Sequence, residues 1–145
     1  MNVPQHVVAM AITLAAIVVF VPPVAAQSSK PPRDPAAIQR KVQRSAELQR
    51  QALEALGNPA QALRLVRNAW TQLKAAQDDM VMNYTNMKPP DPTLTIGIRK
   101  AEQALPLIQV AGDMLQNREE SGVEVARDRL QQALRITNSL LATAF

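Results

Sequence analysis

Three methionines close together offer the most conspicuous chemistry of this sequence. Met80, Met82 and Met87 lie within the stretch MVMNYTNM and make up half of the six methionines of the chain. Thioether sulfur is a soft ligand that suits Cu(I), so a methionine cluster can form a copper site. On one continuous helix, however, Met87 lies within about 20° of Met80, whereas Met82 lies about 200° from it. We therefore expect Met80 and Met87 to fill a helical core. The copper alternative requires this helix to end early, near Asn83.

The other residue types exclude most catalytic and metal chemistry. The chain has no cysteine, and its single histidine, His6, lies close to the N-terminus. The rest of the chain therefore offers no thiolate or imidazole for a metal, a haem or proton transfer. Asp78 and Asp79 are adjacent, point about 100° apart on a helix, and are expected on a solvated face. We predict a protein that is not an enzyme and holds no cofactor.

Two further polar motifs have ordinary explanations. Asn83-Tyr84-Thr85 fits the acceptor pattern for N-glycosylation, but a position inside a helix is a poor acceptor. Glu119 and Glu120 are expected near the start of the last helix, where negative charge complements the helix dipole.

The first 26 residues differ from the rest of the chain. No charged residue occurs between Val7 and Ala26, and Pro22-Pro23 is followed by Val24-Ala25-Ala26. Prolines and small residues after an apolar run predict a cleavable secretory signal, residues 1–26, and thus an exported protein that is periplasmic or extracellular. The alternative is an uncleaved membrane anchor over residues 7–26, because the run approaches the roughly 20 residues that span a bilayer. Residues 27–34 are predicted to be a flexible leader.

Proline-flanked caps divide the rest of the chain into helices. Asp34, Asn58 and Asp91 each precede a proline, which places a good N-cap residue before a residue suited to the first helical position. Ser121 with Glu124 three residues later is typical of a capping box. The predicted helices are 35–56, 59–87, 92–117 and 122–143.

Apolar residues recur at alternating spacings of three and four in these segments. The first helix has the weakest stripe, Ile38, Val42, Ser45, Gln49, Ala52 and Leu56. In the second helix the stripe ends with Met80, Tyr84 and Met87. Such stripes and short connections favour an all-α fold, an up-down-up-down four-helix bundle over residues 35–145. Pro106 is expected to bend the third helix. The same stripes could also pair helices of two chains, so a homo-oligomer is possible.

The positive charge is concentrated near the start of the predicted domain. Residues 27–50 hold six basic and two acidic residues and account for the whole net charge of +4. On a helical projection the basic positions lie opposite the apolar stripe of the first helix. We take them as the candidate partner-binding residues: Lys30, Arg33, Arg40, Lys41, Arg44 and Arg50.

These observations leave two classes of function. The favoured one is a non-catalytic, exported bundle that acts by binding, as an accessory, scaffold or adaptor protein of the cell envelope. Its basic first helix would dock onto another envelope protein or an anionic membrane surface. No nucleic-acid partner is expected, because the basic stretch has no interleaved aromatic residues. The alternative is a bundle that carries a ligand, either copper at Met80, Met82 and Met87 or a small apolar molecule between helices near Pro106.

Overall fold

Four α-helices make up the part of the chain that the structure describes. The computed structural model describes residues 33–117 and 119–145, so the predicted signal, residues 27–32 of the predicted leader and Lys30 lie outside it. The helices are α3 (Pro35–Glu54), α4 (Pro59–Asn86), α5 (Pro92–Gln116) and α6 (Glu120–Ala144). No strand occurs within the described residues, and none of their helices is both long and apolar enough to cross a membrane. The predicted all-α fold is confirmed for this part of the chain.

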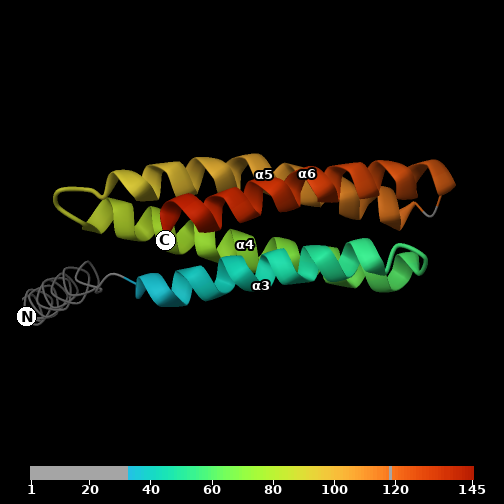
Figure 1. Ribbon diagram of the computed structural model, residues 1–145, viewed down its shortest axis with the longest axis horizontal. Coiled ribbons are helices and arrows are strands. Elements are labelled where there is room, and N and C mark those ends of the chain that lie inside the picture. The colour runs from blue at the N-terminus through green and yellow to red at the C-terminus, as the bar shows by residue number, and fades with distance from the viewer. Residues whose placement is uncertain (1–32, 118) are drawn as a thin grey trace, which may run out of the picture. The chain divides into compact units, whose positions relative to one another are not determined.

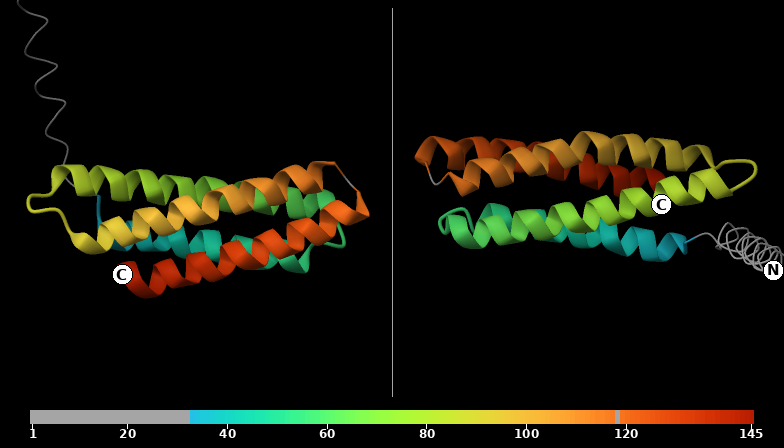
Figure 2. Two further views of the ribbon diagram at one scale, coloured as in Figure 1. Left: turned by 90° about the horizontal axis from the view of Figure 1, so that it is seen from above. Right: turned by 180° about the vertical axis from the view of Figure 1, so that it is seen from behind.

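The helices run alternately up and down and pack side by side (Figure 1). Each helix packs against the next one in the chain, and α3 also contacts α6, which closes the arrangement (Figure 2). The contact between α3 and α6 is the least extensive of the four. This arrangement is consistent with the expected four-helix bundle.

Three of the four predicted helix starts are confirmed by their hydrogen bonds. Asp34 accepts from the backbone N–H of Ala36 at 3.0 Å, Asn58 from that of Gln61 at 3.3 Å, and Asp91 from that of Thr93 at 2.9 Å. A proline follows each cap at the first position of its helix. These short polar side chains satisfy backbone donors that the helix itself leaves without partners.

The fourth predicted start, at Ser121, is wrong. α6 begins at Glu120 with Glu119 as its N-cap, and Ser121 lies inside the first turn. Gly122 also lies inside this helix and approaches the last turns of α5 closely, since a Cβ on Gly122 would lie 2.8 Å from the carbonyl oxygen of Met114. Glu119 and Glu120 do lie at the start of α6, as expected for charges that complement its dipole.

The core consists largely of small side chains between the helices. Ten alanines of the described residues are fully buried: Ala46, Ala52, Ala62, Ala69, Ala76, Ala101, Ala104, Ala111, Ala126 and Ala133. Larger side chains such as Leu73, Met80 and Ile108 fill the space that remains.

The prediction that Tyr84 and Met87 belong to the buried stripe of α4 is wrong, because their side chains are 40% and 36% exposed. The helices that would cover this stripe end before it does.

The weak stripe of α3 is completely buried, including its two polar members. The Ser45 hydroxyl donates to the carbonyl of Ala69 in α4 at 2.7 Å. Gln49 Nε2 donates to Ser45 Oγ at 3.2 Å and to Thr137 Oγ1 in α6 at 3.0 Å. Thr137 in turn donates to the carbonyl of Ala133 at 2.8 Å. This network joins α3 to both of its neighbours through the centre of the bundle.

Gln49 leaves one buried acceptor without a partner, which gives a test of what the network contributes. Its Oε1 accepts no hydrogen bond from the described residues, whereas both hydroxyls that Nε2 contacts already donate to carbonyls. We expect Gln49→Met to leave the free energy of unfolding unchanged or raise it by up to about 1 kcal/mol. Gln49→Ala should lose about 2 to 4 kcal/mol because it creates a cavity. Urea unfolding measures both, and a large loss for Gln49→Met would contradict this assignment.

Two glycines give a second test of the packing. At Gly112 an added Cβ would lie 3.5 Å from Val66 Cγ1, an ordinary contact, whereas at Gly122 it would meet the Met114 carbonyl. We expect Gly112→Ala to raise the free energy of unfolding by up to about 1 kcal/mol through helix propensity. Gly122→Ala should lower it by about 1 to 3 kcal/mol, because backbone has to move. Urea midpoints that shift in the same direction would contradict the close approach at Gly122.

Candidate functional site

The basic residues predicted to bind a partner do not share one face of α3. Arg40, Arg44 and Arg50 are exposed, whereas Lys41 is half-buried. At 100° per residue, Lys41 and Arg50 lie about 180° apart on the helix, with Arg40 and Arg44 between them. Lys41 thus lies at the edge of α3 that faces α4, and the three arginines lie on the outside or the opposite edge.

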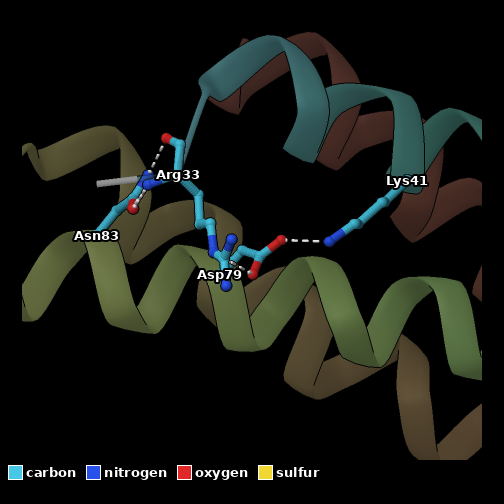
Figure 3. Close-up of polar contacts among 4 residues, drawn as sticks. All are labelled: Arg33, Lys41, Asp79 and Asn83. Atoms are coloured by element: carbon cyan, nitrogen blue, oxygen red, sulfur yellow. Dashed lines mark hydrogen bonds and ion pairs between the residues drawn. The ribbon is translucent and has the colours of Figure 1, made fainter. Parts of the chain in front are cut away.

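Lys41 and Arg33 form ion pairs with one carboxylate of α4 (Figure 3). Lys41 Nζ lies 2.5 Å from Asp79 Oδ2, and Arg33 Nε lies 3.8 Å from Asp79 Oδ1. The Asp79 side chain is only 12% exposed, so its expected place on a solvated face is wrong. α3 packs along this edge of α4 and excludes water from it. Asp78 does face solvent, where Lys74 pairs with it at 3.0 Å.

One turn further along α4, Asn83 binds the backbone of Arg33. The Arg33 N–H donates to Asn83 Oδ1 at 2.7 Å, and Asn83 Nδ2 donates to the Arg33 carbonyl at 2.9 Å. Asn83 is only 3% exposed, so in this fold its amide is both buried and hydrogen-bonded, which makes it a poor glycosylation acceptor. The residues Arg33, Lys41, Asp79 and Asn83, which we call the clasp, fix the chain just before α3 to the end of α4 (Figure 3).

The clasp divides the basic residues into two groups. Arg33 and Lys41 share one carboxylate partner within the molecule, Asp79. Arg44 pairs with Glu47 at 3.0 Å, but both side chains are about half exposed, and such surface pairs are weak. Arg40 and Arg50 form ion pairs with no described carboxylate. Arg40, Arg44 and Arg50 are therefore the basic residues of α3 that have no buried ion-pair partner among the described residues.

The three candidate methionines occupy different environments. Met80 is fully buried, and its Sδ lies 2.8 Å from the position that a Cβ on Gly97 would take. Met82 is half-buried on a different face of α4, and Met87 is the extended C-cap residue beyond the helix. α4 continues to Asn86, so the early end that the copper alternative requires is absent. Within the described residues, no group of three histidine, cysteine or acidic side chains is placed to hold a metal.

A hollow of about 420 Å³ opens to solvent between α4 and α5. It lies on the C-terminal side of Pro106, which is exposed within an unbroken α5. Apolar and charged side chains line the hollow together, among them Val66, Arg67, Trp70, Ile108, Gly112 and Asp113. This is the place in the fold that corresponds to the small-molecule alternative.

Asp79 and Asn83 are the site residues that the sequence interpretation did not identify. They lie four residues apart, so they occupy neighbouring positions on one edge of a helix. The sequence did contain one indication of this pairing. An acidic residue and an amide residue share one edge of a helix, and the preceding helix is basic. This indication identifies Asp79 and Asn83 as partners of the basic segment only when the side of α4 that α3 covers is known.

Comparison with protein-family models, with curated proteins and with solved structures finds no match for this chain. Its function is therefore inferred from the sequence and from the geometry of the bundle.

The clasp predicts how firmly the chain before α3 is held. We expect Asn83→Leu to remove both hydrogen bonds to Arg33, to cost roughly 1 to 2 kcal/mol, and to expose the Arg33 amide to exchange. Hydrogen exchange followed by NMR should show the Arg33 amide exchanging at least tenfold faster than in the parent protein. The matched control is Asn86→Leu, an exposed position one turn on, which should leave that amide unchanged. An equally protected Arg33 amide in Asn83→Leu would show that the clasp does not hold in solution.

Proposed function

We propose that this protein is an exported, non-catalytic helical bundle of the cell envelope that acts by binding an acidic protein partner. The binding surface is the outer face of α3, defined by Arg40, Arg44 and Arg50. One observation carries the proposal: these guanidinium groups are exposed, whereas the other two described basic residues of the segment, Arg33 and Lys41, pair with Asp79 of α4. Export is supported by the uncharged apolar residues 7–26.

The spacing of the three arginines suits an extended acidic surface. Arg40 and Arg44 are one turn apart, about 6 Å along the axis, and Arg50 lies about 15 Å from Arg40. Guanidinium groups bind carboxylates through two parallel hydrogen bonds, which gives both affinity and orientation. Because the inner face of α3 is buried, the helix offers these side chains from a rigid support. A membrane surface or a second copy of the chain would compete for the same face, and crosslinking separates these occupants.

A second candidate function rests on the hollow between α4 and α5. Its volume of about 420 Å³ falls in the range of small-molecule sites. Trp70 and Ile108 supply apolar surface there, and Arg67 and Asp113 supply charge. A small, largely apolar molecule with a polar group fits this lining. This candidate function is independent of α3.

The proposed contact predicts which arginines matter. A photo-crosslinking residue at Gln43, which is exposed on α3, should join the protein to a partner chain in its own cells. Replacing Arg40, Arg44 and Arg50 together with glutamine should reduce this product at least tenfold, and high salt should do the same in membrane-free extracts.

The matched control replaces three exposed arginines of the other helices, Arg64, Arg99 and Arg135, with glutamine. It removes the same charge and should leave the crosslinked product intact. An equal loss in both variants would show that net charge, not the α3 face, is responsible. Crosslinks to lipid alone, or to a second copy of the chain alone, would contradict an acidic protein partner.

A further inference from the structure

Exposed apolar side chains are concentrated at one end of the bundle. Of the six large apolar residues that are exposed among those described, five lie where α4 ends, α5 begins or α6 ends: Val81, Tyr84, Met87, Ile96 and Phe145. The sixth, Val125, lies near the start of α6 at the opposite end. Isolated apolar residues are common on protein surfaces, but their collection at one end calls for an explanation.

The hairpin between α4 and α5 projects beyond its neighbours at this end. An added Cβ on Gly97 would contact Met80 of α4 and Ala144 of α6, so these three positions lie at the same level. α6 ends there, at Ala144, whereas α4 continues for six residues beyond Met80, about 9 Å. We call residues 81–96 the hairpin tip. Figure 2 shows it extending past the C-terminus.

The composition of the hairpin tip suits a boundary between water and lipid. Val81, Tyr84, Met87 and Ile96 expose apolar surface, and the connection Lys88-Pro89-Pro90 is exposed throughout. Tyrosine favours membrane interfaces because its ring is apolar and its hydroxyl is polar. A lysine in such a place extends its ammonium toward lipid head groups.

The chain before α3 reaches the bundle at this same end. The clasp joins Arg33 to Asn83, which lies within the hairpin tip. Seven peptide steps separate Arg33 from Ala26, and they span at most about 25 Å. The twenty residues from Val7 to Ala26 include no charged one. A bilayer that holds this apolar segment therefore lies within about 25 Å of the clasp.

We propose that the hairpin tip, together with Phe145, is a membrane-contacting surface, and that residues 7–26 are retained as the anchor that holds it there. Of the two interpretations of the N-terminal segment, the proposal adopts the uncleaved membrane anchor and not the cleaved signal. It is separate from partner binding at α3, because Arg40, Arg44 and Arg50 lie along α3 and none of them belongs to the hairpin tip. The protein then stands on the membrane by one end and offers α3 laterally.

The anchor is tested by the mass of the protein purified from its own cells. The proposal expects a chain that includes residues 7–26. A mature chain beginning at residue 27 would overturn it, while leaving export and the α3 contact untouched.

The tip is tested with the full chain, synthesised without a signal peptidase and inserted into phosphatidylcholine vesicles whose acyl chains are brominated near the head group. Trp70, the single tryptophan, is first replaced with phenylalanine. Tyr84→Trp and Ile96→Trp then report on the tip, and Val125→Trp, with 37% exposure, reports on the opposite end. Bromine should quench the fluorescence of both tip variants at least twofold more than that of the Val125→Trp control.

Two results would overturn the membrane contact. Quenching that is equal at both ends would show that the bundle lies flat or has no preferred orientation on the vesicle. Absence of quenching at the tip, with or without crosslinked dimers of the chain, would show that lipid does not cover these side chains. Circular dichroism of each variant confirms that it is folded, and the two tip positions report independently if one of them is poorly tolerated.

Discussion

The burial of the inner face of α3 determines where the charged groups of residues 33–50 lie. α3 has few large apolar residues, and its stripe includes Ser45 and Gln49, yet the whole stripe is excluded from water. Burial of polar groups is tolerated only when they find hydrogen-bond partners. Ala69 in α4 and Thr137 in α6 supply them, so the central network sets the position of α3 against two helices at once.

Once α3 is placed, its flank covers one edge of α4 and pairs Lys41 with Asp79. The basic segment then has two parts with different roles. Arg33 and Lys41 belong to the clasp and hold the chain entering the bundle. Arg40, Arg44 and Arg50 face solvent, and they are the residues that we propose to bind a partner. The even balance of charge over the rest of the chain makes this local excess the main electrostatic feature of the described surface.

The two ends of the bundle are built differently. At the end where α5 connects to α6, Gly122 allows the helices to approach closely, and a single exposed Val125 lies nearby. At the other end the α4–α5 hairpin continues past α6, so apolar side chains of the α4 stripe lose their cover. The incoming chain is fastened at this same end by Asn83. Exposed large apolar side chains of the described residues are thus concentrated at the end where Arg33 is bound.

The helices and most of their limits could be predicted from the sequence, because they depend on local chemistry. Asp34, Asn58 and Asp91 cap helices with a following proline in any context, and the spacing of apolar residues indicates the buried face of each helix. The basic segment, and the lack of a histidine or cysteine beyond His6, are likewise evident without a fold.

Which of these residues are buried, exposed or paired depends on the packing of the helices. Periodicity placed Tyr84 and Met87 in the core and Asp79 in water, and all three were wrong, because periodicity describes one helix and not the length or position of its neighbours. Gly122 was found to approach Met114 across the connection from α5 to α6, and the role of Asn83 followed from the approach of Arg33 across 50 residues of sequence. Both are contacts between different helices or segments, which become visible only when the helices are packed.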